Sequence, residues 1–254
     1  MIFAAILQLA VCLLILSWLL KQKPGEQFSK KAVWRFLLFG ALSAVVLIAL
    51  SLASPIKKDA FFDLHPLLSG FLTALLTAAL LEEVLKYILF RLAIRKNGEV
   101  LCWQDAILAA VIVAIGFSLL EDLTYLFDGG GSILRALLPA HLLFQAVMGY
   151  YYGKARVTKQ AKYHVLSLAV PILLHTLFDM FLIAIMSITG DPLAMANMTE
   201  KELFALPYAE WLFPLLACAA VVVVGTLIAM IVFAVKLHKW KINGEKQELL
   251  QEEN

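Results

Sequence analysis

Residues 78–90 read AALLEEVLKYILF, an apolar run of helical length that two adjacent carboxylates and a lysine interrupt. The chain around this stretch has 254 residues, and 62% of them are hydrophobic. Soluble globular domains are closer to half apolar. The composition and the length of the apolar runs therefore predict an all-α integral membrane protein. In such a protein the charges of Glu82, Glu83 and Lys86 need a reason.

Seven apolar segments have the roughly 20 residues that a membrane-spanning helix needs at about 1.5 Å rise per residue. They are residues 2–20, 33–53, 66–91, 105–127, 133–153, 165–188 and 209–236. The first segment has no basic region and no small-residue cleavage site, so it predicts a retained helix and not a signal peptide. We expect one polytopic domain over residues 1–254 in a cell membrane, with a cytoplasmic tail at 238–254.

The basic residues are distributed unevenly between the loops of this topology. Alternate loops and the tail carry 16 of them: Lys21, Lys23, Lys30, Lys31, Arg35, Arg91, Arg95, Lys96, Lys154, Arg156, Lys159, Lys162, Lys236, Lys239, Lys241 and Lys246. The other loops carry four: Lys57, Lys58, Arg135 and Lys201. This asymmetry predicts an N-terminus outside the membrane and a C-terminus in the cytoplasm. Topology and the lipid bilayer account for the basic loops, so we expect no nucleic-acid partner.

Two of the predicted outer loops have distinct sequence features. DGGGS at 128–132 predicts a flexible hinge. In the loop at 189–208, Thr199 and Glu202 predict a capping box that opens a short surface helix, which Pro207 ends.

Ionisable residues inside spanning helices are costly and are functional candidates by default. They are Glu82, Glu83 and Lys86 in the third segment, Glu121 and Asp122 in the fourth, His141 with Gln145 in the fifth, and His175 and Asp179 in the sixth. At about 1.5 Å per residue they lie between the midplane and the outer half, roughly 14 to 20 Å from the cytoplasmic side. Since the other segments have essentially none, we predict one shared site.

The spacing within the helices supports one site, because residues four apart share a face. His141 and Gln145 begin a stripe that Gly149 and Gly153 continue, and these glycines allow a neighbouring helix to approach closely. In the sixth segment the pair is His175 and Asp179, where the carboxylate can orient the histidine or act as a ligand. Glu82 and Lys86 form a similar pair, in which each charge lowers the cost of the other.

Two histidines and several carboxylates can bind Zn²⁺ and leave a position for water. Such a metal polarises a peptide carbonyl, and a further glutamate then serves as general base and acid. The sequence has no GxSxG or HExxH motif and no Ser/His/Asp set at one depth, so it does not suggest nucleophilic catalysis. The three cysteines are far apart and predict neither a disulfide framework nor a thiolate metal site. They are Cys12, Cys102 and Cys218.

Transport is the alternative function, because intramembrane Glu, Asp and His side chains also form proton relays and ion paths. A proton- or cation-coupled transporter usually has inverted repeats and more than seven helices, and no repeat is visible in this sequence.

Four motifs in order on consecutive segments resemble those of the PrsW-type intramembrane proteases, within the CAAX-prenyl-protease and bacteriocin-processing superfamily. They are EEVLK at 82–86, GFSLLEDLTY at 116–125, HLLFQAVMGYYYG at 141–153 and HTLFD at 175–179. The resemblance covers about residues 65 to 185, so the catalytic helices are expected at about 65–188. The segments 2–20, 33–53 and 209–236 flank them.

The resemblance implies a membrane-embedded peptidase, usually described as a metalloprotease. Both a metal mechanism and one using glutamate and histidines alone remain open in the superfamily. The PrsW branch implies cleavage of a single-span anti-sigma factor on its outer side, as the first step of a stress response in a bacterial plasma membrane.

Carried over by position, the resemblance implies catalytic roles for five residues: Glu82, Glu83, Glu121, His141 and His175. Asp179 is the sixth catalytic candidate, because it lies four residues after His175. The metal ligands expected among them are His141, His175, Glu83 and Glu121. Asp122 and Asp179 stand where the family often has Asn, which adds negative charge. That charge favours either a bound cation such as Zn²⁺ or protonated carboxylates, and it leaves open which acid carries the catalytic proton.

Overall fold

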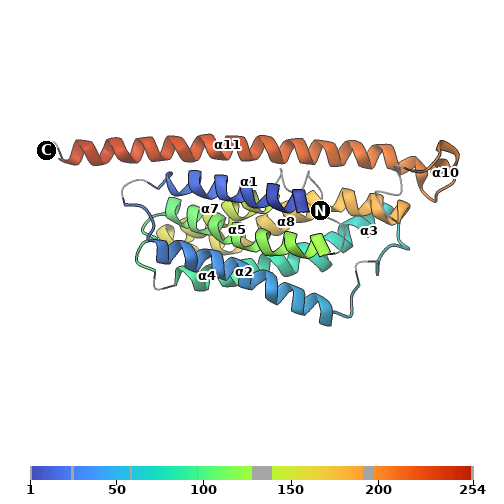
Figure 1. Cartoon of the computed structure of the whole chain (residues 1–254), viewed down its shortest axis with the longest axis horizontal. Helices are drawn as coiled ribbons and strands as arrows, with labels where there is room; N and C mark the ends of the chain where they lie inside the picture. The colour runs from blue at the N-terminus through green and yellow to red at the C-terminus, as the bar shows by residue number, and fades with distance from the viewer. Residues whose placement is uncertain are drawn as a thin grey trace.

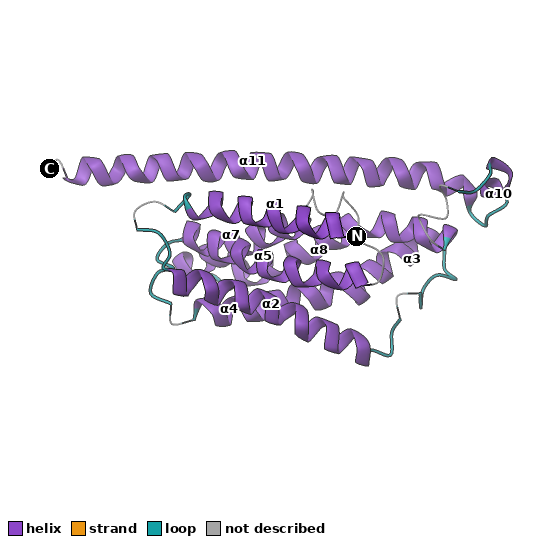
Figure 2. Ribbon diagram, viewed as in Figure 1, coloured by secondary structure: helices purple, strands orange, loops and turns teal. Residues whose placement is uncertain are grey.

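The computed structural model describes residues 2–23, 26–57, 59–95, 97–127, 139–190 and 197–252, without the side chains at 2–5, 122, 125–127 and 244–252. Its elements are α1 Ile2–Leu20, α2 Lys30–Ala53, α3 Pro66–Thr73, η1 Ala74–Ala79, α4 Leu80–Ile94, α5 Trp103–Phe127, α7 Ala140–Thr158, α8 Ala161–Thr189, α10 Glu200–Phe204, η2 Ala209–Trp211 and α11 Leu212–Glu252. All regular structure in these ranges is helical, which confirms the predicted all-α class (Figure 2).

Five helical stretches in the described ranges are long and apolar enough to cross a membrane. They are Lys30–Ala53, Pro66–Ile94, Trp103–Glu121, Ala161–Thr189 and Ala209–Asn243. A shorter apolar helix covers Ile6–Leu20. These helices fit a multi-pass protein of the cell membrane, as the composition indicates. The expected number of seven spans and their orientation stay predictions.

Helix α5 lies at the centre of the bundle, and α11 lies along its outside (Figure 1). In the apolar stretch of α5 that is long enough to cross a membrane, 78% of the residues are buried inside the protein. The corresponding share in α11 is only 17%. The difference follows from the sequence of α5, which is apolar on every face between Ala106 and Ile115. A helix that is apolar all round is stable only where protein or lipid surrounds it. Helix α5 is therefore the support on which α1, α2 and α7 pack.

Glycines allow the helices beside α5 to come close. A Cβ added at Gly40 of α2 would overlap the carbonyl oxygen of Val113 in α5, and one at Gly116 of α5 would overlap a carbonyl oxygen of α2. On the other side of α5, Gly149 and Gly153 of α7 lie against the backbone of its first turns. The close approach predicted for this second pair is confirmed, with α5 as the neighbour.

The predicted third segment is a continuous helical stretch with a π-helical turn in its middle. A π-helical turn at Ala74–Ala79 separates α3 from α4 and ends three residues before Glu82. Such turns occur mostly as single bulges and frequently at functional sites. The extra residue per turn rotates the face on which Glu82, Glu83 and Lys86 lie relative to that of α3.

Several predicted ends differ from the observed ones. The fifth segment begins at Ala140, while residues 133–138 and the DGGGS hinge lie outside the described residues. Helix α11 continues to Glu252 instead of ending near 236, because the tail has no proline and is rich in helix-forming Lys, Glu, Gln and Leu. The predicted capping box of Thr199 and Glu202 is confirmed, and α10 ends before Pro207.

Candidate active site

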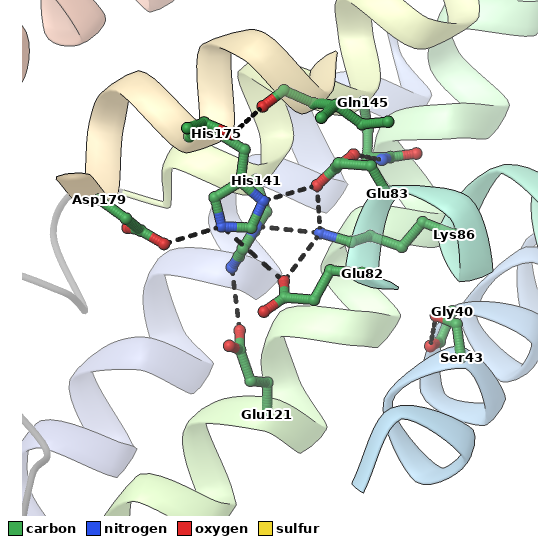
Figure 3. A network of polar contacts seen from close by, with 12 residues as sticks. Gly40, Ser43, Glu82, Glu83, Lys86, Glu121, His141, Gln145, His175 and Asp179 are labelled. Atoms are coloured by element: carbon green, nitrogen blue, oxygen red, sulfur yellow. Dashed lines mark hydrogen bonds and ion pairs between the residues drawn. The ribbon is translucent and has the colours of Figure 1, made fainter. Parts of the chain in front are cut away.

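Polar side chains from four helices meet inside the bundle (Figure 3). They are Glu82, Glu83 and Lys86 of α4, Glu121 of α5, His141 and Gln145 of α7, and His175 and Asp179 of α8. The six candidate catalytic residues are thus in one place, each in contact with at least one other of these side chains. The side chain of Asp122 lies outside the described part of the chain.

Glu83 is fully buried and has contacts on both carboxylate oxygens. Its Oε1 accepts a hydrogen bond of 2.7 Å from Nζ of Lys86 and lies 3.0 Å from Nδ1 of His175. Its Oε2 accepts a hydrogen bond of 2.8 Å from Nε2 of Gln145. A buried carboxylate is tolerated only when paired and hydrogen-bonded in this way. Glu83 therefore links α4 to α7 and α8.

Glu82 is held more loosely than its neighbour. Its Oε2 lies 3.3 Å from Nζ of Lys86 and 4.0 Å from Nε2 of His175. Its side chain retains 8% of its exposure, compared with 0% for Glu83. The two adjacent glutamates thus have different environments, although they look equivalent in the sequence.

Lys86 lies between the acidic residues and a histidine. Besides both glutamates, its Nζ contacts Nδ1 of His141 at 3.1 Å and lies 4.1 Å from the centroid of the Phe117 ring. The predicted pairing of Lys86 with Glu82 is confirmed. The contacts with His141 and Phe117 were not foreseen, because charge spacing along one helix contains no information about the side chains of a neighbouring helix.

The tautomer of His141 follows from its neighbours. A lysine ammonium has only donors, so Nδ1 of His141 accepts and the ring hydrogen is on Nε2. That Nε2 lies 2.9 Å from Oε2 of Glu121. His141 therefore lies between Lys86 and Glu121, and it packs edge-on against Phe117.

His175 lies between carboxylates on both sides. Its Nδ1 is 3.0 Å from Oε1 of Glu83, and its Nε2 is 3.1 Å from Oδ2 of Asp179, one turn further along α8. Carboxylates only accept, so both ring nitrogens carry hydrogen and the ring is an imidazolium. It stacks on Phe144 at 5.1 Å between centroids. The predicted orienting contact between Asp179 and His175 is thus present.

Gln145 is a site residue whose role the sequence analysis did not identify. Its spacing from His141 placed it on the same face of α7, but only the structure shows its hydrogen bond to Glu83. Its Oε1 is buried and has no hydrogen-bond partner among the described residues.

Comparison with known protein families matches residues 29–201 to the model of the PrsW family of intramembrane metalloproteases. This range contains every helix that contributes to the site. The chain belongs to the PrsW family. The similarity extends to individual bacterial proteins named Protease PrsW. The chain is 32% identical over 191 residues to the one from Oceanobacillus iheyensis, an alignment that covers 71% of this chain and 83% of the relative.

Two further PrsW relatives match over shorter ranges. The Geobacillus kaustophilus protein is 38% identical over 117 residues, or 44% of this chain and 52% of the relative. The Bacillus subtilis protein is 35% identical over 123 residues, or 46% of this chain and 56% of the relative. In these two comparisons the chain spans about half the length of the relative. No solved structure matches the chain.

The PrsW family description implies a metal ion, and four site residues have the chemistry to hold one. Glu82, Glu83, His141 and His175 each offer one ligand atom, and these atoms all lie within 4.8 Å of one another. Tetrahedral zinc with bonds of about 2.0–2.2 Å would place its donors about 3.3–3.6 Å apart, so the most widely spaced donors of this group would have to move together by roughly 1 Å. The group contains Glu82, whereas the predicted ligand Glu121 contacts the far side of His141.

Charge also favours a cation in this PrsW site. The four carboxylates of Glu82, Glu83, Glu121 and Asp179 face two cationic groups, Lys86 and His175. The excess of negative charge leaves room for a metal ion or for added protons. Since Lys86 contacts three of the four candidate ligands, a metal ion and this ammonium compete for the same donors.

Proposed function

We propose that this chain is a membrane-embedded endopeptidase that uses Glu82 to activate water against a peptide bond of a membrane-anchored protein. The observation that carries the proposal is the difference between the two adjacent glutamates. Glu83 has partners on both oxygens, whereas the contacts of Glu82 in the described residues are to Oε2 alone, and its buried side chain keeps 8% of its exposure while that of Glu83 keeps none. A general base needs a free lone pair within reach of water.

The proposed reaction is a hydrolysis by general acid–base catalysis. Glu82 removes a proton from water as the oxygen attacks the peptide carbonyl, and the protonated carboxyl then delivers that proton to the leaving amine. The developing oxyanion is stabilised by the nearby positive charges of His175 and Lys86 in a low-dielectric interior. Glu83 and Asp179 hold these two cations in position through the contacts described above.

A metal ion is an alternative source of positive charge, because His175 would have to lose a proton before it could bind one. Glu82, Glu83, His141 and neutral His175 would hold the ion, which would supply Lewis acidity for a carbonyl and acidify bound water. The roles given above to Lys86, His175 and Asp179 are those of the chain's own side chains and need no metal. Metal analysis of the purified protein, together with chelator sensitivity of cleavage, separates the two chemistries.

For the substrate, we propose a single-span membrane protein that is cut on its extracytoplasmic side, with an anti-sigma factor in stress signalling as the specific candidate. The support is the expected depth of the site in the outer half of the bilayer and the orientation that the basic loops predict. The likeness to proteins named Protease PrsW supports the peptidase activity itself.

The proposed base is tested with Glu82→Gln, which keeps the shape of the side chain and removes its basicity. Cells that produce either form together with tagged single-span candidates are compared for new N-termini on the outer side. Loss of the general base is expected to reduce cleavage by about 10² to 10⁴-fold. The matched control is Glu200→Gln, the same change at an exposed position of α10, which keeps full cleavage. Cleavage by Glu82→Gln at the wild-type rate would remove Glu82 from the mechanism.

A further inference from the structure

A pocket of about 490 Å³ lies away from the proposed active site, between the last turns of α4 and α7. Three arginines line it, Arg91 and Arg95 from α4 and Arg156 from α7, together with the aromatic rings of Tyr87 and Tyr152. It lies at the end of the bundle where α4 passes into α5, because Arg156 also hydrogen-bonds the carbonyl of Val100 in that connection. In Figure 1 this is the end marked by the C-terminus.

The three arginines of the pocket are not paired with any carboxylate of the described residues. All three side chains are exposed, and in the described part of the chain no Asp or Glu forms an ion pair with any of them. Two acids of the described residues at this end bind other groups: Asp105 accepts from two backbone amides, and Glu99 accepts twice from Ser29. Three converging arginines without acids indicate a site for an anion, and guanidinium forks match phosphate geometry.

The carbonyl oxygens at the C-terminal end of α4 bind a different arginine, which does not line the pocket. Arg35 of α2 donates to the carbonyl oxygens of Leu92 and Arg95 at 3.1 and 3.0 Å. A different arginine thus already satisfies the free carbonyls of the last turn, which cationic side chains often do at a helix C-terminus. Arg156 uses one N–H group for the carbonyl of Val100, and Arg91 lies 5.5 Å from the centroid of the Tyr87 ring. The remaining N–H groups of the guanidinium groups can bind a ligand.

The pocket is also partly apolar on the membrane side. Ile88 and Leu92 line it from α4 and are 46% and 42% exposed. Both residues lie in the stretch Pro66–Ile94, which is apolar and long enough to cross a membrane. A ligand in this pocket therefore meets arginines at one side and a hydrocarbon-facing surface at the other, as a phospholipid does.

We infer that this pocket binds the phosphate headgroup of an anionic phospholipid from the leaflet at this end of the bundle. The guanidinium groups bind the phosphate, Tyr87 and Tyr152 lie at the headgroup level, and the acyl chains lie along Ile88 and Leu92. Basic pockets between spanning helices are known to bind such headgroups. This inference rests on the fold and the pocket, not on the proposed peptidase activity.

Bound lipid would also bridge the two helices that supply half of the active site. Tyr87 follows Lys86 directly in α4, and the ring of Tyr152 in α7 packs 6.3 Å from that of Tyr87 and 5.2 Å from that of Phe90. A phosphate shared by Arg91 and Arg156 ties α4 to α7 just below this aromatic contact. Anionic lipid is therefore expected to stabilise the folded protein, which binds it better than the unfolded chain does.

The test uses the full chain, purified and placed in vesicles of phosphatidylcholine with or without phosphatidylglycerol. Wild-type protein is expected to melt at a higher temperature with phosphatidylglycerol and to retain that lipid in native mass spectrometry. In the triple variant Arg91→Gln, Arg95→Gln, Arg156→Gln, the affinity for phosphatidylglycerol is expected to fall by at least about tenfold. Its melting temperature in pure phosphatidylcholine should fall only slightly, because the substitution at Arg156 removes one hydrogen bond to the carbonyl of Val100. If the triple variant does not fold, Arg91→Gln alone serves and is expected to lose part of the same affinity.

A matched control distinguishes lipid binding in this pocket from the general attraction of surface charge to anionic membranes. Lys30→Gln, Lys31→Gln and Lys239→Gln together remove three exposed basic residues that do not line the pocket. This control variant should keep the phosphatidylglycerol effect. An equal loss in both triple variants would overturn the proposal, because it would indicate diffuse attraction to anionic membranes. Stabilisation by inorganic phosphate or glycerol 3-phosphate equal to that by the lipid would also overturn it, in favour of a soluble phosphate ligand.

Discussion

The charges at the centre of the bundle are buried and paired with one another. Those at its basic end, where Arg91, Arg95 and Arg156 lie, are exposed. In the interior, Lys86 lies within 3.3 Å of both neighbouring carboxylates, and its ammonium is fully buried. At the end of the bundle Arg91, Arg95 and Arg156 line an open pocket and are exposed. Inside a membrane protein the chain has to supply each counter-charge itself, whereas water and lipid headgroups supply it at the ends.

The same residue type shows the difference directly. Glu83 makes three polar contacts to residues of three helices and is completely buried. Glu99 also makes short contacts, at 2.6 and 2.8 Å to the amide and hydroxyl of Ser29, but on the surface. Contact geometry alone therefore does not measure the importance of a charge. The free energy at stake depends on how completely water is excluded.

The largest effect on stability is expected when the interior loses its cation. Lys86→Met keeps the volume of the side chain and removes the cation closest to both Glu82 and Glu83, so that, among the described residues, His175 alone remains to balance them. Removing one partner of a buried pair costs about 3–5 kcal/mol. The change should lower the free energy of unfolding by about that amount, measured by denaturant titration of the purified protein in mild detergent.

A second substitution shows whether charge is the cause. In Lys86→Met combined with Glu83→Gln, one carboxylate is removed together with the lysine, so a substantial part of the lost stability should return. Lys86→Arg, which keeps the charge in a larger group, should lie between the wild type and Lys86→Met. If Lys86→Met were as stable as the wild type, the ammonium would not be what neutralises the glutamates.

Much of this architecture could be predicted from the sequence, because helix length and apolarity are local properties. The positions of Glu82, His141 and His175 at similar depths in separate segments were sufficient to predict that they share a site. The capping box at Thr199 followed from four residues of local sequence.

The finer organisation of the site could not be predicted, because it depends on how helices rotate against one another. The π-helical turn at Ala74–Ala79 sets the direction in which Glu82 and Glu83 face, and no composition signal marks it. For the same reason the sequence could not tell Glu83 from Glu82. The contacts of Lys86 with His141 and Phe117 come from other helices, and periodicity along α4 contains no information about them.

The next largest effect is expected where a neutral side chain supports an interior charge. Gln145→Leu removes the hydrogen bond of 2.8 Å that Gln145 donates to Oε2 of Glu83 and leaves that oxygen buried without a donor. Hydrogen bonds to charged groups contribute about 1.5–3 kcal/mol, which is the expected loss of stability on denaturant unfolding.

A buried hydrogen bond between neutral groups provides the comparison for Gln145. Ser43 is buried in α2 and donates at 2.6 Å to the carbonyl of Gly40. Ser43→Ala should cost less, about 0.5–1.5 kcal/mol, since no charge is involved. An effect of Ser43→Ala equal to that of Gln145→Leu would mean that burial, and not the charge of Glu83, sets the cost at both positions.

The smallest effect on stability is expected for Glu99→Gln at the basic end. The same substitution at Glu83, in the interior, is its comparison. The glutamine retains an oxygen that accepts from Ser29, and water replaces the second contact, so the expected loss of stability is below about 1 kcal/mol. Glu83→Gln leaves Lys86 and His175 with a weaker partner in a dry interior and should cost several times more. Denaturant unfolding of both variants at low and high salt measures the difference. Equal losses at the two positions would contradict the view that exclusion of water, and not contact distance, decides what each glutamate contributes.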